Sequence, residues 1–348
     1  MELTLLGIIL ASLIVVVSIR YLSRRTAFPE SEYPGLPVLI LGLWLIASAV
    51  WGPYFFSIRL PGMFDISVDR LVFIGLLAIL GFGVVSGRVR KVGTISIEVC
   101  VLLFSVMCVA SMFVHGFKQT APEYPSPWNQ FLTGYLLPSL VFLFAQHHVG
   151  AEKDLTVLMR VLSYLGVYLC ITAAFEFFEL RRFVFPRFIN DPKVWLHLDR
   201  ARGPFLNAAF NGSALNYGFV AGIYLLARKK GVARVVHGFL LLLYFPAIFF
   251  TQTRSVYLGF LITLAALFAL YRTPSPKWKL FAMPVAIGLV GLMLVSPRVF
   301  SPDRKTGGIL QTEEVEIRMA LIKRSVQMIQ DQPFFGVGLG QFIPESVK

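Results

Sequence analysis

Residues 3–17 read LTLLGIILASLIVVV, an apolar run without a charged side chain. Strands of a membrane β-barrel alternate apolar and polar positions over about ten residues, so a continuous run of this kind indicates a helix. A helix also satisfies its own backbone hydrogen bonds inside lipid. The stretch therefore predicts a membrane-spanning helix, and similar stretches follow along the chain.

The whole composition agrees with a membrane protein. Hydrophobic residues make up 56% and charged residues 15% of the 348 residues, and a water-soluble domain of this size could not bury that much apolar surface. A membrane helix needs roughly 20 apolar residues, which gives about ten spans. We expect them at 2–19, 36–52, 70–87, 94–114, 131–149, 155–178, 212–227, 235–250, 255–271 and 280–296.

These spans predict an all-α, polytopic helical bundle over residues 1–296. Lys and Arg cluster in alternate gaps between spans, and such loops stay on the cytoplasmic side of a membrane. The clusters are Arg20, Arg24 and Arg25; Arg88, Arg90 and Lys91; Arg228, Lys229, Lys230 and Arg234; and Arg272, Lys277 and Lys279. We therefore expect the N-terminus, held by the first span as a signal anchor, and the segment 297–348 on the outer face.

The same topology explains the net charge of +13, so the charge gives no reason to expect a nucleic-acid partner. Cys100, Cys108 and Cys170 all fall inside predicted spans and show no metal-ligand spacing. We expect no metal and no cofactor.

The outer segment 179–211 is unusually basic for its side of the membrane. Six bases and four aromatic residues lie in it: Arg181, Arg182, Arg187, Lys193, Arg200 and Arg202, with Phe183, Phe185, Phe188 and Trp195. One interpretation is a solvated face. The other is a loop that lies on lipid headgroups and receives a lipid phosphate, which arginine holds through its planar fork.

The outer segment 297–348 predicts an amphipathic helix over 313–331. An apolar stripe at helical spacing supports it: Val315, Met319, Ile322, Val326 and Ile329. Pro333 ends the helix, and Gly336, Gly338 and Gly340 follow, where the backbone can turn sharply or approach a ligand closely. No strand precedes these glycines, so they do not indicate a dinucleotide site.

Three sequence motifs in this half of the chain each contain an arginine. They read RARGPFLNAAFNG (200–212), TQTRSVYLGFL (251–261) and RMALIKRSVQMIQDQPFFGVGLGQF (318–342). Their order resembles the O-antigen ligase and polymerase family of bacterial envelope polysaccharide enzymes. The resemblance covers about 200–342, and the upstream half matches only as a hydrophobic multi-span pattern.

The resemblance implies a metal-independent glycosyltransferase of the bacterial inner membrane. Such enzymes move a glycan from a polyprenyl-pyrophosphate (undecaprenyl-type) carrier to lipid A–core of lipopolysaccharide, or to a growing polysaccharide. By resemblance, Arg202, Arg254 and Arg318 stabilise the departing pyrophosphate. Asn207, Gln252 and the glycines Gly336, Gly338 and Gly340 support that site. We also expect the 313–331 helix to cover the carrier site.

The family's catalytic histidine follows the glycine-rich motif, and this sequence stops at Lys348. The resemblance therefore implies that the histidine and closing spans lie beyond Lys348, that 297–348 is incomplete, and that the catalytic residue is unknown. Glu176 and Glu179 are weak substitutes for the base.

The sequence leaves two alternatives open. The chain could be a transporter for small anions or lipid-linked glycan, although no internal repeat supports it. It could also be an inactive accessory subunit of an envelope-glycan assembly, which the missing histidine favours.

Overall fold

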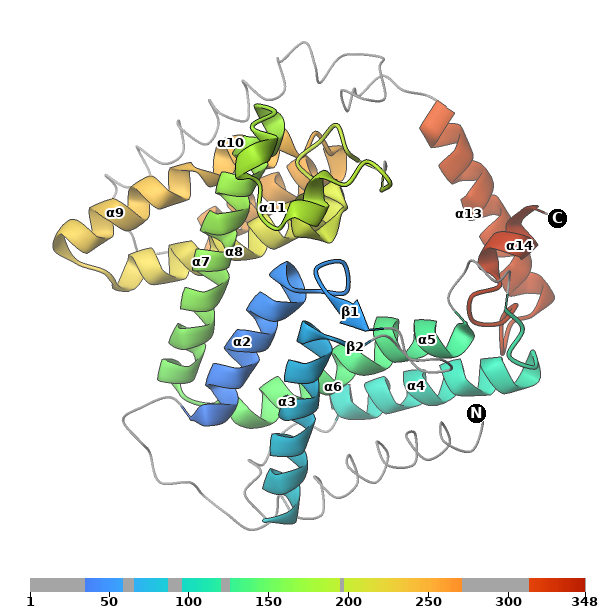
Figure 1. The fold of residues 1–348 in the computed structure, drawn as a ribbon. Coiled ribbons are helices and arrows are strands. Elements are labelled where there is room, and N and C mark those ends of the chain that lie inside the picture. Colours follow the sequence, from blue (N-terminus) through green and yellow to red (C-terminus); the bar gives the residue numbers. More distant parts are fainter. Residues whose placement is uncertain are drawn as a thin grey trace.

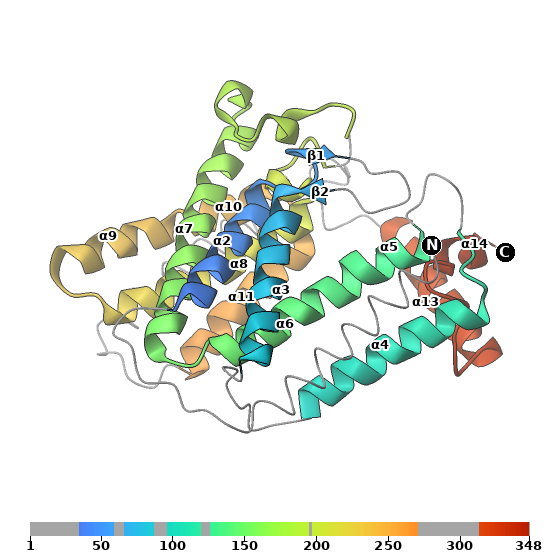
Figure 2. The same ribbon diagram turned by 60° about the horizontal axis from the view of Figure 1, so that its bottom comes forward.

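A computed structural model describes residues 35–58, 66–86, 96–119, 126–194, 197–270 and 313–347. The first and tenth predicted spans lie outside these residues, as do the basic clusters at 20–25, 88–91 and 272–279. Figures 1 and 2 show the arrangement of the elements.

The described chain is mostly helical. Its longer helices are α2 (Leu36–Val50), α3 (Val68–Val85), α4 (Ser96–Val114), α6 (Leu137–His148), α7 (Glu152–Phe177), α8 (Ala208–Arg228), α9 (Gly231–Leu242), α11 (Arg254–Leu270) and α13 (Glu313–Asp331). Short elements are α5 (Pro127–Phe131), η1 (Leu132–Leu136), η2 (Arg181–Phe183), η3 (Arg187–Asn190), η4 (Gly203–Phe205), α10 (Tyr244–Phe250) and α14 (Phe342–Val347). A two-residue antiparallel pair joins β1 (Ser57–Ile58) to β2 (Ile66–Ser67).

The mostly helical class is confirmed, whereas the number of about ten spans is not. In the part of the chain that the structure describes, three helical stretches are long and apolar enough to cross a membrane: Ile97–Val114, Glu152–Phe177 and Gly231–Phe250. Leu36–Val50 and Arg254–Leu267 are apolar but shorter.

The main core forms where α7, α8 and α10 meet, because small residues let these helices approach closely. A Cβ atom on Gly166 of α7 would collide with the Tyr244 hydroxyl, and one on Gly218 of α8 would lie 2.9 Å from the Gly166 Cα and from that hydroxyl. The buried Tyr244 donates this hydroxyl to the Ser163 carbonyl at 2.9 Å. Its polar tip is thereby satisfied inside an apolar core.

Two further clusters join the remaining helices. Leu41 of α2, Leu76 and Leu80 of α3 and Phe144 of α6 pack together. Met112 at the end of α4 packs with Trp128 and Phe131 of α5. Leu339, from the glycine-rich stretch far along the chain, packs against that last cluster.

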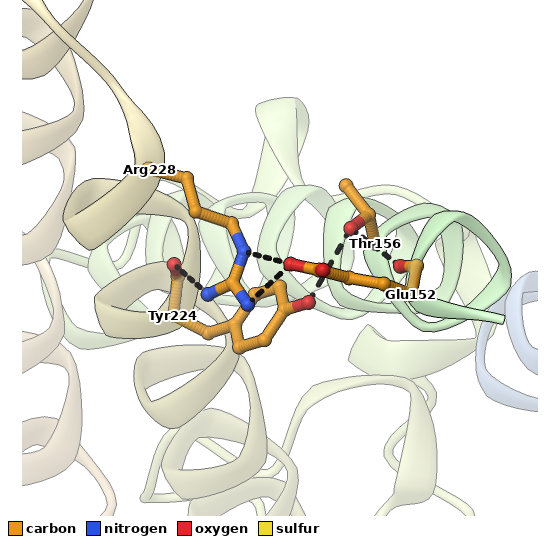
Figure 3. Close-up of polar contacts among 4 residues, drawn as sticks. All are labelled: Glu152, Thr156, Tyr224 and Arg228. Carbon is orange, nitrogen blue, oxygen red and sulfur yellow. Dashed lines mark hydrogen bonds and ion pairs between the residues drawn. The ribbon is translucent and has the colours of Figure 1, made fainter.

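The antiparallel helices α7 and α8 are also joined by a polar cluster at one end (Figure 3). Arg228, the last residue of α8, donates from Nε and Nη2 to Glu152 Oε1 at 3.1 and 2.8 Å. Its guanidinium lies 3.7 Å from the centre of the Tyr224 ring. The Tyr224 and Thr156 hydroxyls are 3.3 Å apart. This cluster links the start of α7 to the end of α8.

Helix α13 runs over Glu313–Asp331, the same residues over which the sequence predicts a helix. The side chains of Met319, Ile322, Val326 and Ile329 on its apolar stripe are between 48% and 64% exposed. Both Figure 1 and Figure 2 show α13 apart from α8 and α11. The helix therefore does not cover the region around Arg202 and Arg254, contrary to the sequence-based expectation.

Candidate functional site

The first two arginine motifs lie side by side. The backbone N–H of Ala201 donates to the Phe250 carbonyl at 3.1 Å. One residue earlier, Arg200 Nη1 lies 3.4 Å from the Gln252 carbonyl oxygen. The loop after η3 and the turn between α10 and α11 therefore form one surface at the end of the α7–α8 pair where α7 stops and α8 begins.

Arg202 is buried completely, with 0% of its surface exposed. Its Nε and Nη2 donate to the Ile189 carbonyl at 3.0 and 2.5 Å, and Nη2 also reaches the Asp191 carbonyl at 3.1 Å. Its Nη1 donates to the Val194 carbonyl. An anion could reach this guanidinium only by displacing backbone carbonyls. The arrangement therefore fits a residue that holds the 189–194 loop better than one that contacts pyrophosphate.

Acidic groups lie close to the buried Arg202 guanidinium. Burial lowers the pKa of the Arg202 guanidinium, and the carboxylates of Glu176 and Asp191 oppose that shift. Glu176 also accepts hydrogen bonds from the backbone N–H groups of Arg202 and Gly203, at 3.3 and 3.0 Å. The Glu176 carboxyl group therefore binds the backbone of this loop, and this structural role argues against Glu176 as the general base.

The backbone of this loop needs glycine at position 203. Gly203 has φ +56°, and a Cβ atom there would lie 2.5 Å from Asn211 Oδ1. Asn211 is fully buried and donates from Nδ2 to the Ala201 carbonyl at 2.9 Å. The positive φ and the close approach of Asn211 explain why a glycine occurs at position 203.

Asn207 has a local structural role. Its Oδ1 accepts from the backbone N–H groups of Ala209 and Phe210, at 2.9 and 3.2 Å. These bonds cap the N-terminus of α8, where backbone donors lack partners within the helix. Asn207 therefore fixes the direction in which α8 leaves the loop.

Arg254 differs from Arg202 in its exposure and in its side-chain partners. It is the half-buried first residue of α11, and it makes no hydrogen bond or ion pair with any residue that the structure describes. The preceding Gln252 is buried, with φ +47°, and Thr253 Oγ1 donates back to the Thr251 carbonyl at 2.8 Å. A rigid turn thus presents a positive charge at a helix N-terminus, where the helix dipole also favours an anion.

The third motif lies elsewhere. Gly336, Gly338 and Gly340 adopt φ of +62°, +100° and +80°, which favours glycine at each. His115 Nε2 lies 2.8 Å from the Gly336 carbonyl oxygen, and Ser111 Oγ donates to the Phe335 carbonyl at 2.7 Å.

A Cβ atom on Gly338 would come within about 3 Å of the His115 ring, and one on Gly340 would meet Gln130. Arg318 is exposed on α13. The described residues bring the Arg202 and Arg254 motifs together, and they leave the glycine-rich stretch beside α4 and α5. Helix α13, which carries Arg318, lies apart from α8 and α11 (Figures 1 and 2).

Sequence reasoning missed the contact between His115 and the glycine-rich stretch. The two lie 221 positions apart along the chain, and nothing in the local pattern of either connects them. The glycine spacing was the one available signal, because it marks a backbone that something approaches closely.

An apolar cavity of about 370 Å³ lies between α4 and α6, lined by residues such as Val101, Val109, Phe113, Phe131 and Leu140. Glu98 reaches its wall, 3.6 Å from the buried His147. None of the three motif arginines lines it. Across the described ranges, no group of three or more His, Cys, Asp or Glu residues is placed to hold a metal ion.

Comparison with known proteins bears on the last part of the chain. No curated protein and no solved structure matches the sequence. Residues 239–347 match the model of the O-antigen ligase family, a range that contains the Arg254 and glycine-rich motifs. The predicted resemblance to the O-antigen ligase and polymerase family is therefore confirmed, on the strength of this matched C-terminal segment.

Proposed function

We propose that this chain is an inner-membrane glycosyltransferase that takes a glycan from a polyprenyl-pyrophosphate carrier and transfers it to lipid A–core or to a growing polysaccharide. The family match over 239–347 supports glycan transfer of this type. The observation that carries the residue assignment is the turn at 251–254, which presents Arg254 without a partner among the described side chains and lies against the Arg202 loop.

The chemistry requires a cation at the leaving group. When the acceptor hydroxyl oxygen bonds to the sugar, the bond from the sugar to the carrier breaks, its electron pair leaves with the pyrophosphate, and the hydroxyl proton passes to a general base. A fixed guanidinium stabilises that developing charge, and it acts more strongly where water is excluded. In this proposal Arg254 contacts the pyrophosphate directly, aided by the N-terminus of α11 and by the neighbouring Arg200.

The other motif residues receive different roles. Arg202 is a positioning residue, because it ties the 189–194 loop down beside Arg254. Gln252 and Asn207 shape the turn and the start of α8. Arg318 lies on α13, and Gly336, Gly338 and Gly340 lie in the stretch that contacts the end of α4 and α5. We propose no direct contact between these residues and the pyrophosphate. We place the Arg254 surface on the periplasmic face, following the charge pattern of the loops.

The test is glycan transfer in membranes supplied with the lipid-linked donor and the acceptor. Arg254→Ala is expected to lower the rate by about 100-fold or more, as removal of one preorganised donor to a developing anion does. Arg254→Lys is expected to retain part of the rate, because the charge remains and the planar fork is lost.

Arg228→Ala is the matched control, because it removes an exposed arginine at the opposite end of the α7–α8 pair. It is expected to transfer glycan at close to the unaltered rate. Membrane insertion of each variant is checked by its abundance in the membrane fraction. Near-normal transfer by a fully inserted Arg254→Ala variant would refute the assignment.

A further inference from the structure

Large aromatic side chains are exposed where the chain leaves α7 and where it approaches β1. Phe183 is 53% exposed and Phe185 52%, and in the segment before β1, Tyr54 is 63% and Phe55 43% exposed. A water-facing surface does not normally carry so many large apolar side chains together, and such patches mark sites of contact with proteins or membranes.

These side chains form one surface rather than scattered positions. Phe55 meets Phe185 edge-on with ring centres 6.2 Å apart, and Tyr54 stacks on Phe188 at 6.0 Å. The Phe185 carbonyl accepts a hydrogen bond from the Tyr168 hydroxyl on α7 at 2.5 Å. The segment is therefore held against the helix with its aromatic rings outward.

Arginines stand among the rings. The Arg182 guanidinium lies 4.8 Å from the centre of the Phe183 ring, and Arg182 and Arg187 are both exposed. Among the described residues, neither makes a hydrogen bond or ion pair through its side chain. Their charge is therefore available to an anion from outside the protein.

The position of this surface indicates its surroundings. Its residues Arg182, Phe183, Phe185 and Arg187 follow within ten positions of Phe177, the last residue of a 26-residue helix that is long and apolar enough to cross a membrane. Figure 2 shows the loop after α7 beyond the end of that helix, with β1 and β2 at the same end. Residues just past the end of a spanning helix lie at the level of the lipid headgroups, where aromatic rings are favoured.

We infer that Tyr54, Phe55, Phe183, Phe185, Arg182 and Arg187, which we call the aromatic–arginine surface, bind the phosphates of anionic phospholipids in the leaflet at the C-terminal end of α7. The rings lie among the headgroups and upper acyl chains, and the two guanidinium groups hold phosphate oxygens. This goes beyond glycan transfer and does not depend on it, because these residues are separate from the turn that carries Arg254.

The occupant is the phospholipid headgroup rather than the carrier of the glycan donor. The aromatic–arginine surface spreads over an open edge of the protein, with exposed rings on both segments, and such an edge meets the abundant lipids of the leaflet. Anionic headgroups complement the unpaired arginines, and they attract basic groups at the membrane surface.

The experiment places a photo-crosslinking benzoylphenylalanine at Phe183 in the full chain, reconstituted into vesicles. One set of vesicles contains phosphatidylcholine alone, and the other contains phosphatidylcholine with phosphatidylglycerol. Crosslinking to phosphatidylglycerol, corrected for its share of the lipid, is expected to exceed crosslinking to phosphatidylcholine by about fivefold or more. Combining the probe with Arg182→Gln and Arg187→Gln is expected to bring this ratio close to one.

Tyr217 supplies the matched control position. It is an aromatic residue, 66% exposed, within α8, and a probe there is expected to crosslink both lipids in proportion to their amounts. A probe at Phe183 that forms no lipid adduct, or that shows no preference for the anionic lipid, would overturn the inference. A preference for the anionic lipid that persists after both arginine substitutions would also overturn the inference.

A third set of vesicles distinguishes the two sources of lipid phosphate. It contains phosphatidylcholine with phosphatidylglycerol and a small share of polyprenyl phosphate. If the ratio of phosphatidylglycerol adducts to polyprenyl phosphate adducts follows the ratio of the two lipids in the vesicles, the headgroup assignment is supported. Adducts mainly with polyprenyl phosphate would overturn it and would assign the surface to the carrier instead.

Discussion

An arginine and a glutamate lie at each end of the α7–α8 pair, in opposite environments. At one end Arg228 and Glu152 form an ion pair whose side chains are 42% and 73% exposed. At the other end Arg202 is fully buried, and both it and Glu176 bind mainly backbone groups. The same two residue types thus make a surface contact at one end and a buried loop anchor at the other.

The difference shows that environment, rather than residue type, decides what an arginine contributes. An exposed ion pair competes with water and salt and contributes about 0–1 kcal/mol. Removing one member of a buried charged contact lowers stability by several kcal/mol, because the group that remains is buried without its partner. The two ends therefore make opposite predictions for matched substitutions.

The largest expected effect is at Arg202. Arg202→Ala removes the donors to the carbonyls of Ile189, Asp191 and Val194, and buried carbonyls without donors are costly. We expect about 3–5 kcal/mol of destabilisation, measured as a lower midpoint of thermal unfolding for the protein purified in detergent. Arg202→Lys is expected to recover little of it, because one ammonium cannot reproduce the planar fork. Unchanged thermal stability in both variants would show that the loop is not anchored by this residue.

A smaller effect is expected at Gly203. Gly203→Ala places a side chain at φ +56° and 2.5 Å from Asn211 Oδ1, and backbone strain of this kind costs about 1–3 kcal/mol. Gly231→Ala is the control, because Gly231 also has φ +56° but no atom within 4 Å of the added Cβ. If the two variants lower the midpoint of thermal unfolding equally, the contact with Asn211 does not contribute to stability.

The smallest effect is expected at the exposed end. Arg228→Ala and Glu152→Ala are each expected to change stability by no more than about 1 kcal/mol. The double variant should show a coupling between them that weakens as salt is added. A loss as large as that of Arg202→Ala would remove the contrast between the two ends.

The sequence predicted the helices well where apolar runs are long, as for α4 and α7, because a run of that length has few other stable structures in lipid. It also predicted the range of α13 from a single apolar stripe. It could not predict the partners of Arg202, since these are backbone carbonyls whose positions depend on how the loop folds. It likewise placed Arg318 with the other two arginines, because order along the chain carries no information about distance in space.

The glycine-rich stretch ties the family-matched segment, residues 239–347, to earlier parts of the chain. It contacts Ser111 of α4 and His115 just after α4, both outside residues 239–347. Phe250, at the α10–α11 turn in that segment, contacts the backbone at Ala201. The segment that a family comparison delimits is therefore not an independent module. Exchanging it between relatives would require the end of α4 and the loop before α8 to be exchanged with it.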